Sequence, residues 1–574
     1  MQRTQHWWQE AVVYQVYPRS FGDSNGDGIG DINGIRARIP HLVDLGIDAL
    51  WLSPHYVSPM NDAGYDVADY RDVDPIFGDL DDLKNLIKEL HANGIRLFID
   101  IVPNHTSWDH EWFLEALEHP PVNDPSVPSL TRYEEGPWAR YHLIRGRDGG
   151  KTSPNEWPSV FGGNTWNQVN DANGEPSGWW YLHIFDKSQP DIDWTNPEVR
   201  DEFLGHLKFW FDMGVDGFRI DVAHGLVKAE GYPEYEQPGP GDPSHYIPFW
   251  DQDPVHDIWR EWRAIAEQYD PPRVFVAEAW VNPAERGAMY LRHDELHTGF
   301  NFPYLTAAWN GRALRKVIDQ SMHGNYLVGA PTTWVLENHD VWRSATRYAP
   351  LANGEEAASL DANLDISKSA DWREPRNLEI GQLRARAGFM TMLALPGTAY
   401  IYQGQELGLE EVFDIPDELR QDPAFANTKG ENLGRDGCRV PLPWDNSSET
   451  FGFNSGSETW LPQPRRWADK TVEKQSTDAE SFLSLARTAL KIRKEQSALG
   501  GITQYTIDMI WDETPEEIIS FVRPERNDGH AIRCVMNMGR EDYQLPAGDV
   551  LLQSNPTAVV DGKLAPHSTV WLTA

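Results

Sequence analysis

The sequence predicts an α/β protein built on a closed (β/α)8 TIM barrel, and three observations lead to this fold class. Short apolar strands alternate with amphipathic helical segments, which is typical of parallel sheets. Eight such strands fall within roughly 400 residues, as a closed barrel requires. Polar residues gather directly after several strands, where the loops of a barrel carry its chemistry.

The expected strands are short apolar runs that end at turn residues or polar clusters. In chain order they lie within residues 12–18, 47–54, 96–104, 214–224, 273–280, 297–302, 331–340 and 397–406. The clearest helices between them are predicted at 79–93, 196–213 and 257–269, with apolar side chains at helical spacing. The second of these begins with the capping pair Asn196 and Pro197 and ends at Gly214.

Breaks in this alternation predict further domains. Residues 106–178, rich in Pro, Gly, Trp and Asn, interrupt the barrel after its third strand and predict a small inserted domain. The barrel then comprises residues 1–105 and 179–500, with an irregular capping segment at about 350–464. Strand patterns within 501–574 predict a C-terminal antiparallel β-sandwich.

Amino-acid composition and net charge indicate which kinds of binding partner to expect. A formal net charge of −38 repels phosphate backbones and anionic lipid, so we expect neither nucleic acid nor a membrane as partner. Two cysteines, Cys438 and Cys534, cannot form a disulfide framework, and no stretch resembles a signal peptide or a membrane span. We therefore expect a cytoplasmic protein. The 25 tryptophans include candidates for stacking on sugars, although packing explains most of them.

An Asp-rich loop near the N-terminus predicts a cation site. Side-chain oxygens alternate along DSNGDGIGD, as in the first nine positions of a calcium loop, but Gly34 stands at the twelfth position where an EF-hand has Glu. We expect a structural Ca²⁺ or Mg²⁺ in a shorter oxygen cage, with a merely Asp-rich turn as the alternative. The candidate ligands are Asp23, Asn25, Asp27, Ile29 and Asp31.

Three carboxylates, Asp221, Glu278 and Asp340, follow three different strands, so a barrel would bring them into one pocket. Glycosidic cleavage with retention needs a carboxylate nucleophile and a second carboxyl group that first donates and later accepts a proton. Arg219 shares a strand face with Asp221 and is expected to lower its pKa and keep it ionised, which suits the nucleophile. Apolar sequence neighbours favour protonated Glu278 as the acid/base, and Asp340 is left to stabilise the transition state. A purely structural pair of Arg219 and Asp221 is the alternative.

Four stretches resemble the signature regions of glycoside hydrolase family 13, the α-amylase family, in order and spacing. They are DIVPNH (100–105), GFRIDVAH (217–224), the stretch around Glu278, and ENHD (337–340). The opening residues, GYDVADY, VFGGNTW, QPDIDW (189–194) and GRDGCRVPLPW are similar to the branch of oligo-1,6-glucosidases and α-glucosidases. The resemblance covers nearly the whole chain and implies a catalytic barrel, an inserted B domain and a C-terminal β domain.

The resemblance also implies roles around a bound sugar ring. Asp221, Glu278 and Asp340 keep the roles already given, and the oxygen loop would hold Ca²⁺ or Mg²⁺. The implied substrate-binding residues are Tyr65, Asp66, His105, Phe161, Arg219, His339 and Arg439. Tyr65 would stack on the ring, while Asp66 and Arg439 would hold its non-reducing end and close the pocket, which means exo action. His224 matches a residue beyond the cleavage point. Buried structural histidines are the alternative for His105 and His339.

The expected function is that of a retaining exo-α-glucosidase acting on short α-glucosides such as maltose. Asp193 and Val440 depart from the usual Asn and Thr of this branch. Val222 directly after the nucleophile tends to accompany α-1,6 cleavage in the family, whereas Ala223-His224 is similar to actinobacterial α-glucosidases that cleave α-1,4 bonds, so we expect α-1,4 preference.

Other functions remain open at this point. They are an α-1,6-specific oligo-1,6-glucosidase and a glucosyl-transferring or isomerising enzyme of the sucrose or trehalose type, because all form the same glucosyl-enzyme. A non-catalytic barrel is disfavoured, since such relatives lack the carboxylates present here. The expected partner is a small α-glucoside, and the sequence does not indicate an oligomeric state.

Overall fold

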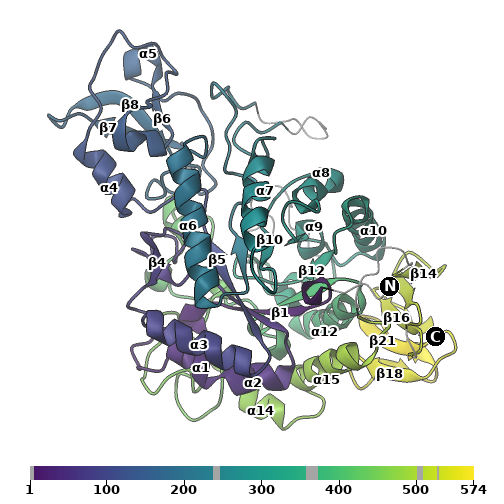
Figure 1. Ribbon diagram of the computed structural model, residues 1–574. Coiled ribbons are helices and arrows are strands. Elements are labelled where there is room, and N and C mark those ends of the chain that lie inside the picture. Colours follow the sequence, from purple (N-terminus) through teal and green to yellow (C-terminus); the bar gives the residue numbers. More distant parts are fainter. Residues whose placement is uncertain (1–5, 237–245, 357–372, 501–507, 527–528) are drawn as a thin grey trace.

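The computed structural model describes residues 6–236, 246–356, 373–500, 508–526 and 529–574 (Figure 1). Among these residues, eight parallel strands pair in the order β11-β10-β9-β5-β2-β1-β13-β12. The first strand therefore lies between the second and the last, as in a closed barrel. Between β11 and β12 the ring is joined by the hydroxyl of Thr333, which donates to the carbonyl oxygen of Gly299. The predicted (β/α)8 barrel is confirmed.

Each barrel strand falls within a range predicted from the sequence. They are β1 (Val12–Val16), β2 (Ala49–Leu52), β5 (Arg96–Ile101), β9 (Gly217–Ile220), β10 (Val274–Ala277), β11 (Thr298–Gly299), β12 (Thr333–Val335) and β13 (Thr398–Tyr402). Every residue of β1, β2, β9, β10 and β13 is buried. Continuous apolar runs predict this burial, because both faces of a parallel barrel strand are covered.

Helices cover the outside of the barrel and lead the chain from one strand to the next. The longer ones are α2 (Ile39–Leu45), α3 (Leu80–Ala92), α6 (Pro197–Met213), α7 (Val255–Ala266), α10 (Gly311–Val328), α12 (Leu378–Ala394) and α15 (Phe482–Glu495). Helix α6 begins where the Asn196 side chain accepts a hydrogen bond from the Glu198 N–H, and it ends at Gly214 with φ 112°. That left-handed turn leads the chain directly into β9, so α6 fixes the position of Asp221.

An inserted unit lies in the chain between β5 and α6. It contains α4 (Glu111–Glu118) and the antiparallel strands β6 (Leu143–Arg145), β7 (Trp166–Asn170) and β8 (Pro176–Leu182), ordered β6-β8-β7. Figure 1 shows this sheet projecting from one end of the barrel. A further antiparallel pair, β3 (Tyr56–Val57) and β4 (Asp69–Val73), belongs to the loop after β2.

The C-terminal part forms two antiparallel sheets at the other end of the molecule (Figure 1). One contains β14 (Ile510–Trp511), β15 (Ile518–Arg523), β16 (Ile532–Asn537), β21 (Ser568–Thr573) and β18 (Val550–Gln553), and the other β17 (Tyr543–Gln544), β20 (Lys563–Leu564) and β19 (Val559–Val560). The first sheet packs on α12, where the hydroxyl oxygens of Thr391 and Thr569 are 3.1 Å apart. Residues 501–507, where the sequence places the start of this domain, lie outside the described residues.

The segment predicted to cap the barrel is only partly irregular. Residues 357–372 lie outside the described residues, and α12 and β13 belong to the barrel itself. The irregular part that reaches the pocket follows β13 and contains the short helix α13 (Pro423–Asn427). Of the helices in the described part of the chain, none combines the length and the apolar character needed to cross a membrane.

Candidate active site

Polar side chains converge on a cavity of about 280 Å³ at the carboxyl ends of the barrel strands. Asp221 directly follows β9, Glu278 directly follows β10, and Asp340 comes from the loop after β12. The lining residues are Asp62, Tyr65, His105, Val160, Phe161, Phe185, Asp221, Val222, His224, Ile247, Trp250, Asp251, Glu278, Trp280, Val281, Asn282, His339, Asp340, Asp422, Ala424, Asn432, Gly434 and Arg435. The fold thus brings together all three carboxylates predicted from the sequence.

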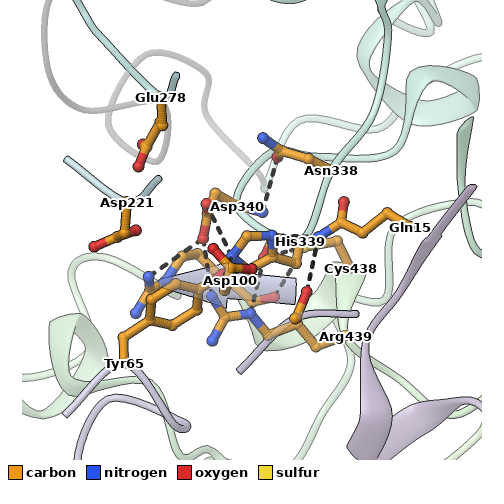
Figure 2. Close-up of polar contacts among 12 residues, drawn as sticks. Gln15, Tyr65, Asp100, Asp221, Glu278, Asn338, His339, Asp340, Cys438 and Arg439 are labelled. Atoms are coloured by element: carbon orange, nitrogen blue, oxygen red, sulfur yellow. Dashed lines mark hydrogen bonds and ion pairs between the residues drawn. The ribbon is translucent and has the colours of Figure 1, made fainter. Parts of the chain in front are cut away.

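Arg219 holds two of these carboxyl groups side by side. Its Nη1 is 2.7 Å from Oδ1 of Asp221 and its Nη2 is 2.7 Å from Oε2 of Glu278, while Nη1 also donates to Oδ1 of Asp100 at 2.6 Å. Figure 2 shows the carboxyl group of Glu278 directed toward that of Asp221. One guanidinium thus holds the two carboxyl groups close together, and a short separation is what distinguishes retaining from inverting glycosidases. Arg219 itself acts from behind this pair and does not line the cavity.

Asp221 is more basic than the sequence indicates. Burial raises the pKa of its carboxyl group well above the ordinary value; Arg219 opposes this rise, and the carboxyl groups of Glu278 and Asp100 add to it. The expected lowering is therefore corrected: the cation is shared by three carboxyl groups that are all removed from water.

Asp340, by contrast, is held as a fixed anion. Its Oδ1 is 2.9 Å from Nη2 of Arg439 and 3.3 Å from Nη1 of Arg435, and its Oδ2 is 3.2 Å from Nε2 of His339. Burial opposes ionisation, but the charges of Arg435 and Arg439 outweigh it and hold the pKa of Asp340 well below its usual range, while His339 adds a polar contact. The environments of Asp221 and Asp340 therefore favour different protonation states.

Tyr65 and the two predicted histidines form one wall of the cavity. The rings of Tyr65 and His339 lie parallel, with centroids 5.3 Å apart, and the Tyr65 hydroxyl is 2.7 Å from Nε2 of His339. The other ring nitrogen of His339 is 2.7 Å from Nε2 of Gln15. Burial lowers the pKa of His105 to about 4 and that of His339 well below 6.5, so both are neutral near pH 7. Neutral imidazoles can hydrogen-bond sugar hydroxyls without adding charge.

Two residues predicted to hold the far end of the sugar lie behind the cavity wall. The buried carboxylate of Asp66 accepts hydrogen bonds from the N–H groups of Asn61 and Asp62 and from the Ser58 hydroxyl. Arg439 is 1% exposed and contacts Asp340 and the carbonyl oxygen of His339. These two assignments are corrected, because both side chains support the pocket from outside it.

Asp62 and Arg435 stand in the cavity instead. Nη2 of Arg435 is 2.7 Å from Oδ1 of Asp62, and its Nε is 2.5 Å from Oδ2 of Asp422. Each lies four residues before the residue chosen from the sequence. In the sequence these residues are the first aspartate of NDAGYD and the first arginine of GRDGCR. Nothing in the neighbouring residues indicates that they, rather than the second aspartate and the second arginine, reach the cavity.

The remaining wall of the cavity is largely aromatic. Phe161 lines the cavity, with the Arg435 guanidinium 5.4 Å from its ring. His224 stacks on Trp250 at 4.6 Å, and Trp280 donates its indole N–H to Oε1 of Glu278 at 3.1 Å. Sequence reasoning singled out Phe161 and His224 but neither tryptophan, although Trp280 lies only two residues after Glu278.

The Asp-rich loop offers oxygen atoms only, which is the donor set that Ca²⁺ and Mg²⁺ prefer. Asp23 accepts hydrogen bonds from the N–H groups of Asn25, Gly26 and Gly28, and Asp27 accepts one from the Ile29 N–H. Asp31 caps the following helix through the Gly34 N–H. The residue types and the tight loop fit a hard cation, although no cluster of three His, Cys, Asp or Glu side chains poised for a metal occurs among the described residues.

Comparison with known proteins assigns the family. A family model for the α-amylase catalytic domain matches residues 15–368 and 372–501, which is most of the chain. This protein belongs to the α-amylase family. It is 34% identical over 532 residues to an oligo-1,6-glucosidase of Parageobacillus thermoglucosidasius, covering 89% of this chain and 87% of that protein. It is 33% identical over 557 residues to a probable α-glucosidase of Rhizobium meliloti (strain 1021), covering 93% and 90%.

Solved structures are similar to this protein along the entire chain. The α-glucosyl transfer enzyme XgtA superposes with a TM-score of 0.80 at 30% identity, over 100% of both chains. Together these similarities place this α-amylase family member in the branch of α-glucosidases and oligo-1,6-glucosidases. It is accordingly a glycoside hydrolase by family, with the barrel, inserted sheet and C-terminal sheets described above.

Proposed function

We propose that this protein is a retaining exo-α-glucosidase that releases glucose from the non-reducing end of short α-glucosides, of the actinobacterial type and with α-1,4 bonds preferred. The supporting observation is the pair of carboxyl groups, Asp221 and Glu278, held by one guanidinium in a cavity that also contains ionised Asp340. Its substrate is a small neutral sugar.

Double displacement assigns one role to each member of the pair. A carboxylate oxygen of Asp221 attacks C1 of the glucosyl ring, the bond from C1 to the leaving oxygen breaks, and Glu278 gives its proton to that oxygen. Glu278, now ionised, then takes a proton from water as the water oxygen attacks C1 and the ester bond to Asp221 breaks. Two inversions return glucose with its original α configuration.

The other wall residues stabilise the positive charge that develops on the ring. Asp340 remains ionised between Arg435, Arg439 and His339, so its negative charge is fixed before the reaction begins. His105 and His339 are neutral and offer hydrogen bonds to ring hydroxyls.

Exo action is supported by a charged cluster within the cavity. The ion pair between Asp62 and Arg435, backed by the bond from Arg435 to Asp422, spans the loop after β2 and the segment after β13. Such a cluster can hydrogen-bond the hydroxyl groups of a terminal glucose, and its ion pairs join the two segments across that side of the cavity. The non-reducing end would therefore stop there.

Glucosyl transfer is the second candidate function. Trp250, Trp280 and Ile247 line the side of the cavity near Glu278 and give it an apolar wall on which an acceptor sugar could bind in place of water. The structural similarity to an α-glucosyl transfer enzyme is consistent with this. An α-1,6 preference is the other alternative, supported by Val222 and by the oligo-1,6-glucosidase relatives.

Glucose release from maltose, isomaltose, sucrose and trehalose separates these candidates. We expect the highest kcat/KM for maltose, with glucose as the main product even at high maltose concentration. Mostly longer or rearranged sugars would favour transfer, and faster cleavage of isomaltose would favour the α-1,6 specificity.

We also propose that the loop of Asp23, Asn25, Asp27, Ile29 and Asp31 holds a structural Ca²⁺ or Mg²⁺. A bound cation stabilises the folded state by mass action, so chelation should lower the melting temperature and added Ca²⁺ or Mg²⁺ should restore it. Asp27→Asn should weaken this response, whereas Asp69→Asn, on an exposed strand residue, should leave it intact. Identical melting temperatures with chelator and with cation would contradict the proposal.

A further inference from the structure

Glu278 is held at both of its oxygens, and the two sets of donors differ. Oε2 accepts hydrogen bonds from Nη2 of Arg219 at 2.7 Å and from the backbone N–H of Val222 at 3.0 Å. Oε1 accepts one hydrogen bond from a described side chain, the indole N–H of Trp280 at 3.1 Å. Both Trp280 and Glu278 line the cavity, so this contact lies at the cavity wall.

The indole ring is itself fixed by packing. It lies nearly parallel to the ring of Phe302, with centroids 3.6 Å apart and an interplanar angle of 16°. Phe302 belongs to α9 (Phe302–Leu305), which follows β11, and is buried in the barrel core. The direction of the Trp280 N–H is therefore set by the barrel and not by a mobile loop side chain.

We propose that Trp280 is the positioning residue of the acid/base, because its indole N–H fixes Oε1 of Glu278 toward the leaving oxygen. This inference rests on the proposed function, in which Glu278 donates a proton to the leaving group. As that proton departs, negative charge develops on Glu278 and the hydrogen bond from the indole strengthens. The contact thus stabilises the transition state more than the ground state.

Several charged or titratable groups face Glu278 and would also affect its protonation. Arg219 comes from β9, Asp221 and His224 from the loop after β9, and Asp100 from β5. Arg219 contacts Oε2 and the indole contacts Oε1, so removing the indole N–H changes only one of the influences on the group. The indole stabilises the ionised carboxyl, so without it the proton should be lost at a higher pH.

Trp280→Phe removes the N–H and keeps a ring against Phe302. One hydrogen bond to a charged group corresponds to roughly 10- to 100-fold in rate, so kcat/KM for maltose should fall by about that factor. For α-glucosyl fluoride, whose fluoride leaves with little help from an acid, the loss should stay below about threefold. The basic limb of the kcat/KM pH profile for maltose should move up by roughly half a unit to one unit.

Two matched variants make the result decisive. Phe161→Leu alters the cavity wall beside Arg435, at the end that holds the glucosyl ring common to both substrates, so its losses of kcat/KM should be equal for the two and its basic limb should not move. If Trp280→Phe fails to fold, benzothienylalanine at position 280 replaces only the N–H by sulfur and keeps the ring shape. The inference would be overturned if the position-280 variant lost kcat/KM equally on maltose and α-glucosyl fluoride and the basic limb of its pH profile did not move.

Glu278→Gln distinguishes a failure of this inference from a failure of the proposed function. That variant should lose far more activity on maltose than on α-glucosyl fluoride. If it does so while the position-280 variants do not, only the positioning role is wrong. If Glu278→Gln itself shows equal losses, the acid role fails and the proposal for Trp280 fails with it.

Discussion

One guanidinium serves three carboxyl groups in the active site. Arg219 contacts Asp100, Asp221 and Glu278, and its side chain is 3% exposed. Burial raises the pKa of Asp100 to about 6 despite this contact, which shows how strongly removal from water acts here. Replacing Arg219 would leave three carboxyl groups facing each other without a cation, so this residue is needed for folding as well as for catalysis.

Asp62 and Asp66 are close in sequence but should respond differently to substitution. Asp62→Asn should raise KM for maltose by about tenfold or more, since it weakens the contact with Arg435 inside the cavity. Asp66→Asn should instead lower the melting temperature, because that carboxylate accepts three hydrogen bonds within its own loop. Steady-state kinetics and thermal unfolding of both variants check this; a larger KM effect for Asp66→Asn would restore the original assignment.

Glu411 gives a prediction about pH. This carboxyl group is 4% exposed behind the active site, and burial raises its pKa to about 8. A carboxyl group whose pKa is higher in the folded state stabilises that state at low pH and loses this contribution as the pH rises from about 4.5 through about 8. Glu411→Gln cannot ionise at this position. The difference in melting temperature, variant minus parent, should therefore be more positive at pH 8.5 than at pH 5. An unchanged difference between the two pH values would contradict this.

The extended segment 189–193 ties the inserted sheet to the barrel through alternate side chains. Gln189 donates to Oδ2 of Asp62 at 3.1 Å, Asp191 is 2.7 Å from Nζ of Lys228, and Asp193 forms an ion pair with Arg132. Arg132 also explains why Asp193 stands where the branch usually has Asn: the extra negative charge has a partner from the inserted unit.

The two members of this ion pair differ in burial, so their removal should differ in cost. The Asp193 side chain is 0% exposed and that of Arg132 is 26% exposed. Arg132→Ala would leave a buried anion with the Thr195 donors but without its arginine, and should lower the free energy of unfolding by about 3 kcal/mol. Asp193→Asn leaves a cation that water can reach and should cost about 1 kcal/mol or less. Urea unfolding of both variants measures this; equal losses would show that burial does not decide the cost.

Hydrophobic periodicity was sufficient to locate the barrel strands and the helices α3, α6 and α7, but it did not locate α2, α10 or α12. Strands such as β9 lie between a glycine-capped helix and a polar cluster, and both signals are local. The choice of Asp62 over Asp66 was not local, because it depends on which carboxylate meets Arg435, 373 residues away in sequence. Trp250 and Arg435 reach the cavity from long irregular segments, whose paths no periodicity fixes. The rise in the pKa of Asp221 depends on burial by the whole fold.

In the complete molecule, the barrel brings distant parts of the sequence to one cavity. Asp62, Asp221, Glu278 and Arg435 come from loops after four different strands. Figure 1 shows the inserted sheet and the C-terminal sheets at opposite ends of the barrel, so the C-terminal sheets support α12 rather than the cavity. The net charge of −38 opposes anionic ligands and suits a neutral sugar.

Trapping the covalent intermediate tests the central claim most directly. 5-Fluoro-α-glucosyl fluoride forms a slowly hydrolysed glucosyl ester with the nucleophile of a retaining α-glucosidase, and peptide mapping by mass spectrometry locates it. We predict one 5-fluoroglucosyl group per chain, on the peptide that contains Asp221, and none in Asp221→Asn. A stable adduct on another residue, or turnover of the reagent by Asp221→Asn at the parent rate, would contradict the account.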